Sequence, residues 1–258
     1  ANTTSLPGNH IAPHAFYEDA NSDIWVATQN WGFAKFDRQT EKFQRFQHEP
    51  GKPNTVHSND INVICGDGKG GIWIGMRGGG LDHFDPNKKQ FTHCLLTDKT
   101  PTRLCSKMIL SLHLAKNGEL WIGHGEGLSI RDTAGRFRCY WPNKDQPASL
   151  SAKYILDIFE TDDRFWLGTV NGLNSFTGSG AFARYFPEDQ PDIPKGVGYN
   201  YIFRVFKDRD GDFWVGTNAG LLRFFPDRIP HFELVHHSPT APTSIGKGGF
   251  FDIYQDNS

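Results

Sequence analysis

Three kinds of residue grouping in this sequence have the types and spacing that chemistry would need. Glycine-rich stretches at Gly123–Gly127 and Arg77–Gly80 have the composition of phosphate-binding loops. The acidic stretch Asp208–Asp212 has the composition of a calcium loop. Histidines also occur in pairs that would suit a metal: His10 with His14, His48 with His57, and His236 with His237. Each grouping has a structural explanation that competes with the chemical one.

The glycine-rich and acidic stretches are better explained as tight turns. A phosphate loop needs a helix directly after it, because the amides and dipole of the helix N-terminus hold the anion. Here strand-like residues follow instead, at Leu128 and Leu81. An EF-hand loop needs a Glu at its twelfth position, which is Ala219 in this sequence. We therefore expect neither a nucleotide nor a calcium ion, and no cofactor.

Metal, thiol and hydrolytic sites gain no support from spacing. The paired histidines lack carboxylates at a spacing that fixes metal geometry. The four cysteines include no C-x-x-C pair, which excludes a zinc knuckle or a thioredoxin-type motif. Either all four are unpaired core residues, or Cys94 and Cys105 close a short loop in an oxidising compartment. No Gly-x-Ser-x-Gly elbow marks a nucleophile, and no carboxylate pair is singled out for glycoside chemistry.

The elements that must position any site come from an internal repeat. Five tryptophans follow one another at steps of 48, 48, 45 and 48 residues. A glycine and an apolar residue come about seven positions after each tryptophan, and a strand-like run ending in an acidic turn precedes it. The tryptophans lie in the apolar segments Ile24–Thr28, Ile72–Gly75, Leu120–Gly123, Phe165–Thr169 and Phe213–Thr217. Each unit therefore contains four short strands.

These units have the properties of propeller blades. The tryptophan strand is apolar at consecutive positions, so both of its faces must be covered. Four-stranded units of about 40–50 residues that stack face to face describe a β-propeller. We predict an all-β fold of five four-stranded antiparallel blades within one propeller segment, residues 1–258. The expected repeat boundaries are 5–56, 57–105, 106–150, 151–198 and 199–245.

The last residues, 246–258, look like the start of a sixth unit. Within them, Phe250–Tyr254 is expected to form one extra inner strand. Five units and one strand predict a fragment of a larger propeller, seven-bladed or double, and the alternative is a natural five-bladed ring with a tail. An unpaired strand edge favours pairing with another chain, so a homodimer is a further expectation.

The repeat resembles that of a known family. The segment Asp210–Leu221, which reads DGDFWVGTNAGL, resembles the two-component regulator propeller repeat, and Pro147–Ile155 is similar to the linker of that family. The resemblance covers essentially the whole chain. It implies the non-catalytic periplasmic sensor region of a membrane-bound bacterial signalling protein. In that family the propellers are followed by a second β-domain, a membrane helix and a histidine kinase or diguanylate cyclase.

Charge and hydropathy exclude other classes of partner. The chain has 27 basic and 29 acidic residues, interspersed, with a net charge of −2. No stretch forms a basic nucleic-acid stripe or a polybasic membrane patch. No apolar run approaches the roughly 20 residues that a spanning helix needs. We therefore expect no nucleic-acid partner and no direct membrane insertion of this segment.

The topology indicates where a ligand would bind. Neighbouring strands run antiparallel, so the turn between the second and third strands and the linker between units lie on one edge of a blade. We call this the binding edge, because its linkers are long and varied, as recognition loops usually are. Candidate ligand-binding residues on it are Trp31, Arg77, His124, Glu126, Asn171, Asn218, Tyr154, Tyr199 and Tyr201.

These residue types favour a polar ligand with apolar faces. Aromatic rings stack on such faces while planar polar groups bind hydroxyls, which points to a small molecule or an oligosaccharide. We predict a sensor that recognises such a ligand and passes the signal to a cytoplasmic kinase or cyclase. The alternatives are a propeller enzyme, such as a lyase or glycosidase, and a propeller that binds another protein.

Overall fold

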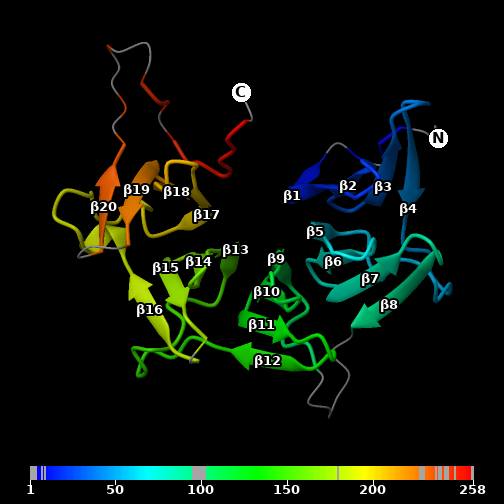
Figure 1. Cartoon of the computed structure of the whole chain (residues 1–258), viewed down its shortest axis with the longest axis horizontal. Helices are drawn as coiled ribbons and strands as arrows, with labels where there is room; N and C mark the ends of the chain where they lie inside the picture. Colours follow the sequence, from blue (N-terminus) through cyan, green and yellow to red (C-terminus); the bar gives the residue numbers. More distant parts are fainter. Residues whose placement is uncertain are drawn as a thin grey trace. The chain divides into compact units, whose positions relative to one another are not determined.

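In the computed structural model of the chain, the regular secondary structure of the described residues is almost entirely β-strand (Figure 1). Its described residues form five four-stranded antiparallel sheets, as the repeat predicted. Consecutive strands pair within each sheet, so every sheet is an up-and-down meander. The structure describes residues 5–256 except 7, 9, 95–102, 179, 227–229, 236, 238, 239, 241–243 and 247, and for residues 12–14 the backbone alone.

Each sheet is one blade, numbered 1 to 5 along the chain. Blades 1 to 3 comprise β1(Ile11–Glu18), β2(Ile24–Thr28), β3(Gly32–Asp37), β4(Lys42–Phe46), β5(Ile61–Gly66), β6(Ile72–Met76), β7(Leu81–Asp85), β8(Gln90–Cys94), β9(Ile109–Leu114), β10(Leu120–His124), β11(Gly127–Arg131) and β12(Phe137–Tyr140). Blades 4 and 5 comprise β13(Ile155–Glu160), β14(Phe165–Thr169), β15(Gly172–Phe176), β16(Phe182–Tyr185), β17(Ile202–Lys207), β18(Phe213–Thr217), β19(Leu221–Phe225) and β20(His231–Leu234).

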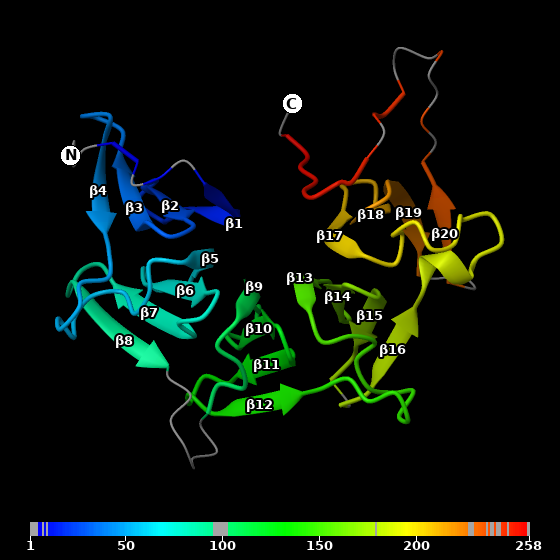
Figure 2. The same cartoon turned by 180° about the vertical axis from the view of Figure 1, so that it is seen from behind.

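The blades belong to two compact units, residues 1–139 and 140–258. In the first unit, the inner strands β1, β5 and β9 of successive blades lie next to one another. In the second unit, β13 and β17 are neighbours in the same way, which is visible from both sides (Figures 1 and 2). Blades that are consecutive within a unit therefore stack as they do in a propeller.

The repeated tryptophans fill the space between blades. Trp25 is 1% exposed and packs against Phe84 of the next blade. Trp166, also 1% exposed, packs against Phe213 and Phe224 of the next blade. Trp214 of blade 5 is only half-buried, because no further sheet follows blade 5 among the described residues. The two-sided burial that was inferred from the apolar strands thus depends on the following blade.

The glycine-rich stretches are turns, as predicted. Gly80 and Gly127 of these stretches have φ of +80° and +145°, and Gly172 in the equivalent turn of blade 4 has φ of +99°, a region that L-residues with a side chain rarely adopt. A Cβ at Gly172 would also lie 2.8 Å from the Tyr185 carbonyl oxygen. Glycine is required here because the turn brings the backbones of β15 and β16 close together.

Two expectations about the chain were wrong. The described residues of the 250–254 segment form no strand, although the Phe250 N–H donates to the Thr217 carbonyl at 2.9 Å. This single hydrogen bond reaches the last residue of β18. A strand would need a ladder of such bonds. Both interpretations of the cysteines also failed, because the disulfide joins Cys105 to Cys139 and leaves Cys94 a free thiol. The pairing differs because β12 of blade 3 lies against the linker that enters that blade.

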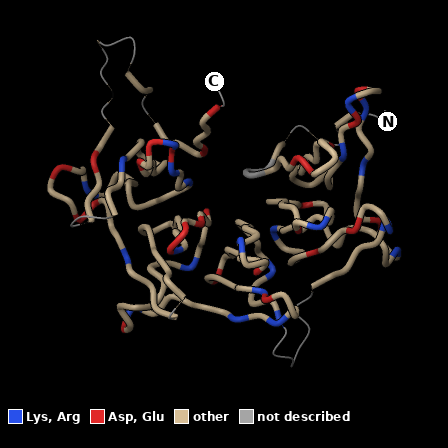
Figure 3. The backbone as a smooth tube through the Cα atoms, in the orientation of Figure 1, with Lys and Arg blue, Asp and Glu red and all other residues tan. Residues whose placement is uncertain are grey.

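The described residues contain one helical element, the single 3-10 turn Pro187–Asp189. No helix in the described part of the chain is long and apolar enough to cross a membrane. Acidic and basic residues are interspersed along the backbone of each unit, without a continuous basic stripe (Figure 3). This distribution agrees with the interspersed charges of the sequence.

Candidate functional site

In the first unit, Trp31 and Arg77 lie at the binding edge as predicted. Trp31 is 51% exposed in the turn between β2 and β3, with its ring over Gly8, where a Cβ would overlap Cδ1. Arg77 begins the turn between β6 and β7, and its N–H donates to the Asp60 carbonyl at 3.0 Å. Its Nε lies 3.8 Å from the Asp60 carboxylate. Both side chains are open to solvent at this edge.

His124 lies inside the turn that connects β10 and β11. It is fully buried, its Nδ1 accepts the Glu126 N–H at 3.2 Å, and its Nε2 contacts the Ser129 hydroxyl at 3.0 Å. Since Nδ1 faces a donor, the ring proton is on Nε2 and is donated to Ser129. Burial lowers the pKa of His124 to about 4, so it stays neutral. His124 therefore supports the turn from within and leaves Glu126 at the surface.

In blade 4 of the second unit, Tyr154 and Asn171 lie at the same edge. Tyr154 is 42% exposed, and its carbonyl accepts the Val170 N–H at 3.3 Å. Asn171 is exposed, and its N–H donates to the Thr169 hydroxyl at 3.0 Å. The linker before β13 and the turn after β14 thus meet at one edge of the blade, as the antiparallel order of the strands predicts.

The densest group of candidate residues is in blade 5. Tyr201, Phe203 and Phe251 form a row of rings, with centroids 4.8 Å and then 4.5 Å apart. Tyr201 is 36% exposed and Phe251 is 63% exposed, so their ring faces are available to solvent. The neighbouring turn contributes Asn218, which is exposed and donates its N–H to the Tyr201 carbonyl at 3.0 Å. We call Tyr201, Phe203 and Phe251 the aromatic row.

Gly249 brings the aromatic row and Asn218 together. A Cβ at Gly249 would lie 3.2 Å from the Asn218 carbonyl oxygen and 3.4 Å from Cζ of Phe251. The chain after β20 returns here and runs beside β17 and β18, in red in Figure 1. An ion pair fixes it, because Arg204 Nε lies 3.1 Å from the Asp252 carboxylate.

A cavity of about 290 Å³ lies at the same edge, beside Tyr199. Tyr199 is only 8% exposed, and burial raises the pKa of its phenol. His237 Nδ1 lies 2.6 Å from the Ile245 carbonyl, to which it donates. The walls are largely apolar and consist of Tyr199, Ala219, Gly220, Leu234, Val235, His237, Ile245, Gly246 and Gly248.

A hydrogen-bond network holds Tyr199 in place. The Glu188 carboxylate accepts backbone N–H groups from Gly196 at 2.7 Å, Gly198 at 2.9 Å and Tyr199 at 2.8 Å. Burial alone would raise the pKa of Glu188, but these donors lower it, so the carboxylate is ionised at neutral pH. The linker that presents Tyr199 is therefore fixed before any ligand arrives.

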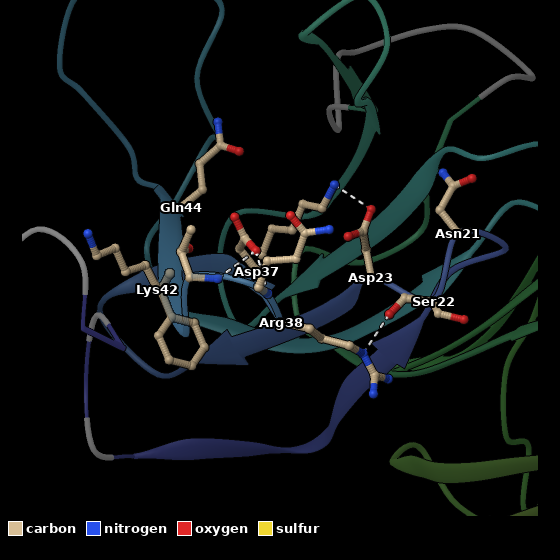
Figure 4. Close-up of a pocket in the computed structure, with 11 residues that line it drawn as sticks. Asn21, Ser22, Asp23, Asp37, Arg38, Lys42 and Gln44 are labelled. Atoms are coloured by element: carbon tan, nitrogen blue, oxygen red, sulfur yellow. Dashed lines mark hydrogen bonds and ion pairs between the residues drawn. The ribbon is translucent and has the colours of Figure 1, made fainter.

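A second cleft lies on the opposite edge of blade 1 (Figure 4). It measures about 540 Å³ and lies between the β1–β2 turn and the β3–β4 turn. Lys35 forms an ion pair with Asp23 inside it, and Arg38 Nε donates to the Ser22 carbonyl at 3.0 Å. Phe43 contributes one ring, and Lys42 and Gln44 line the outer side. This cleft is polar, in contrast to the cavity beside Tyr199.

Sequence reasoning missed several residues of the blade 5 site. Phe203, Phe251, Glu188 and His237 were not among the candidate ligand-binding residues, although Tyr199, Tyr201 and Asn218 were. One signal was present, because Phe251 follows Phe203 by 48 residues, the dominant step of the tryptophan repeat. No group of three or more metal-ligating side chains gathers within the described residues.

Solved structures with a similar fold include two bacterial surface or signalling proteins. The extracellular domain of a hybrid two component system from B. thetaiotaomicron aligns with a TM-score of 0.72 at 19% identity, over 96% of this chain and 38% of that one. PorZ, a surface component of the type-IX secretion system of Porphyromonas gingivalis, aligns with a TM-score of 0.58 at 14% identity, over 91% and 29%. This chain thus spans well under half of either structure.

Streptogramin B lyase shares the fold as well. It has a TM-score of 0.60 at 14% identity, over 89% of this chain and 72% of that one. No curated protein sequence matches this chain significantly. Residues 5–30 and 196–219 match the model of the two component regulator propeller family. Two segments of the chain therefore match the two-component regulator propeller repeat, and the five sheets share the β-propeller fold of these structures.

Proposed function

We propose that this chain is the ligand-recognising part of a bacterial sensor, and that it binds a glycan fragment or a similar small molecule on the binding edge of blade 5. The observation that carries the proposal is the aromatic row beside Asn218. Three neighbouring rings, two of them well exposed, are an unusual surface for a soluble protein unless something covers them. The family repeat and the similar fold of an extracellular signalling domain support the same role.

The chemistry of the aromatic row fits a sugar better than a wholly apolar ligand. A pyranose ring has an apolar face of C–H groups that stacks on Tyr201 or Phe251, while its rim consists of hydroxyls. The Asn218 amide both donates and accepts hydrogen bonds, as hydroxyls require. The cavity beside Tyr199 would take a small substituent of the sugar, such as an acyl group, because its walls are largely apolar.

The Cys105–Cys139 disulfide supports an extracytoplasmic location. Disulfides persist in the periplasm and outside the cell, and are rare in the reducing cytosol. We therefore place the chain in the periplasm, as part of an inner-membrane signalling protein. Passage of the signal to a kinase or cyclase, and dimerisation on binding, belong to the same proposal.

The proposal is tested by calorimetric titration of a library of neutral and acidic oligosaccharides against the purified chain. Tyr201→Ala and Phe251→Ala should each weaken binding roughly tenfold, because one stacking contact contributes about 1 kcal/mol or more. Trp141→Ala is the matched control, since Trp141 is 56% exposed in the same unit but lies outside the blade 5 site. Unchanged affinity in both variants would disprove the assignment to the aromatic row.

Two further sets of variants locate the ligand. Trp31→Ala and Arg77→Ala test whether the first unit contributes to binding. Lys42→Ala and Phe43→Ala test the cleft of Figure 4, and a loss of affinity in these two alone would place the ligand on the opposite edge.

The alternative is a propeller enzyme, because a lyase and a GH74 enzyme have similar folds. Mass spectrometry of each bound oligosaccharide after long incubation separates the two functions. Intact ligand agrees with a sensor, whereas cleaved or unsaturated products would indicate a glycosidase or a lyase.

A further inference from the structure

The linkers that enter blades 2 to 5 are each fixed at the same place. We call the residue four positions before the inner strand the anchor residue. The anchor residues are His57, Cys105, Ser151 and Gly198, before β5, β9, β13 and β17. Three are held by the two outer strands of their own blade, and Gly198 is held by Glu188. The chemistry of the contact differs from blade to blade.

In blade 4, the anchor is held by an amide and a guanidinium. Asn174 Oδ1 accepts the Ser151 N–H at 2.9 Å, and Asn174 Nδ2 donates to the Ser151 hydroxyl at 2.7 Å. Arg184, opposite Asn174 in the sheet, donates to the carbonyls of Ser149 at 2.7 Å and Leu150 at 3.0 Å. Neither an amide nor a guanidinium responds to redox conditions.

In blade 2, the same positions hold a carboxylate and an imidazole. Asp82 Oδ2 accepts the His57 N–H at 2.8 Å. His93, opposite Asp82, contacts Asp82 Oδ1 through Nδ1 at 2.8 Å and the Pro53 carbonyl through Nε2 at 3.0 Å. The arrangement of blade 4 thus recurs with different side chains.

In blade 3, a disulfide bond holds the anchor residue in place of these hydrogen bonds. Ser129 occupies the position of Asn174, two residues after the turn glycine, and its hydroxyl lies 3.5 Å from Cys139 Sγ. Cys139 therefore occupies the position of Arg184 and His93. It is bonded to Cys105, the anchor residue itself, with a Cα–Cα distance of 6.4 Å. Both cysteines are partly exposed, so a small dithiol can reach the bond.

We propose that Cys105–Cys139 is a reversible thiol–disulfide modification site that controls the order of residues 103–108, which enter blade 3. The modifying partner is a dithiol, such as the active site of a thiol oxidoreductase. One thiolate of the dithiol attacks a protein sulfur, giving a mixed disulfide, and the other cysteine leaves as a thiolate that takes up a proton. The second thiol of the reagent then releases the remaining cysteine. The reagent loses two electrons, and the protein gains two thiols.

Reduction would act on the binding edge of the first unit. The linker residue Leu104 is 1% exposed and packs in a cluster with Trp73 and Leu81. The Lys107 carbonyl accepts the Gly80 N–H at 3.0 Å, in the turn that begins at Arg77. Loss of the disulfide leaves the anchor beside Ser129, whose hydroxyl is already the acceptor for His124. The linker and the Arg77 turn then loosen together.

Hydrogen exchange measured by mass spectrometry tests this directly. In the oxidised chain, peptides covering residues 103–108 and 77–80 should exchange slowly. Dithiothreitol should raise their exchange roughly tenfold or more, because the bond closes a long loop, and reoxidation should reverse the effect. The Cys105→Ser/Cys139→Ser variant should exchange fast and ignore dithiothreitol. Equal exchange in the oxidised and reduced wild-type chain would overturn the proposal.

A transplant keeps the test decisive if the double variant fails to fold. Cys105→Ser, Ser129→Asn and Cys139→Arg together install the Ser151–Asn174–Arg184 set of blade 4 in blade 3. This triple variant should recover slow exchange at residues 103–108 and be unaffected by dithiothreitol. Fast exchange in a folded triple variant would mean that these positions are not equivalent. Peptide mapping that finds Cys94 bonded to Cys105 would also contradict the proposal.

Discussion

The cost of removing a repeated tryptophan should depend on whether a blade follows it. Trp166 and Trp214 occupy the same position in blades 4 and 5, six residues before the turn glycine. Trp166 is 1% exposed, whereas Trp214 is half-buried. Truncation of each to Ala in the same unit therefore compares burial between blades with burial inside a single blade.

The contacts give the expected magnitudes. The Trp166 ring lies 5.3 to 5.7 Å from three aromatic rings, those of Tyr185, Phe213 and Phe224. Complete burial of a tryptophan with such neighbours predicts a loss of about 3–5 kcal/mol for Trp166→Ala. The Trp214 side chain donates a hydrogen bond from Nε1 to Asp208 at 2.7 Å, and the Arg223 guanidinium lies 5.6 Å from its ring. These contacts and its partial burial predict about 1–3 kcal/mol.

Urea unfolding followed by circular dichroism gives the total loss, and hydrogen exchange of β14 and β18 peptides assigns it to a blade. Trp166→Ala should also speed exchange in β18 and β19, because its ring packs on blade 5. Equal losses for the two variants, or an effect of Trp166→Ala confined to blade 4, would refute the view that the tryptophans join neighbouring blades.

Three further predictions follow from the linkers and thiols. Arg184→Ala and Arg184→Lys should both destabilise the second unit, by about 2–3 kcal/mol for Ala in urea unfolding, because a lysine cannot bond several carbonyls from one planar group. Burial alone would lower the pKa of His93, but the hydrogen bonds to Asp82 and Pro53 raise it. The stabilisation of the folded chain by charged His93 is therefore full below about pH 6.5 and is lost as pH rises through the raised pKa. Melting curves between about pH 6 and 9 should show this decline in the wild-type chain and not in His93→Gln. Burial raises the pKa of Cys65 to about 12, so a thiol reagent at about pH 8 should leave Cys65 unmodified in the folded chain and label two thiols, Cys65 and Cys94, once urea unfolds it.

The fold was predictable because the repeat itself encodes it. The spacing of the tryptophans and the apolar run around each predicted strand number, sheet order and turn positions in all five blades. The prediction for residues 250–254 failed for a physical reason. A strand requires a ladder of hydrogen bonds, whereas this segment contacts blade 5 through the bond from the Phe250 N–H to the Thr217 carbonyl at the end of β18.

The disulfide was not predictable from cysteine spacing. Cys94 and Cys105 are close in sequence, whereas Cys105 and Cys139 are 34 residues apart. The true pair follows from the blade, because the outer strand of each blade lies against the linker that enters it. Only a comparison of Cys139 with Arg184 and His93 at the same sheet position shows why the bond forms there.

The sequence predicted the turn and linker residues of the candidate site, but not the residues that contact one another across successive repeats. The antiparallel order of the strands predicted the edge of the blade on which the turns and linkers lie, and thereby residues such as Tyr201 and Asn218. The strand order did not predict contacts between repeats, which occur where one blade meets the next. Those contacts recur at one repeat length: Asp157 accepts the Val205 N–H 48 residues later at 2.7 Å, and Arg204 pairs with Asp252, also 48 residues later.

The same step joins Phe203 to Phe251, whose rings are 4.5 Å apart. Although residues 250–254 form no strand, they lie beside β17 as the next inner strand would, so a side chain of β17 and its counterpart one repeat later form a pair when both point out of the blade. Adding 48 to each aromatic residue of the predicted inner strands would therefore have found Phe251 from Phe203 without a structure. The site is thus a product of the repeat, because Phe203 gains a neighbouring ring when the residues one repeat later include an aromatic residue at the equivalent position.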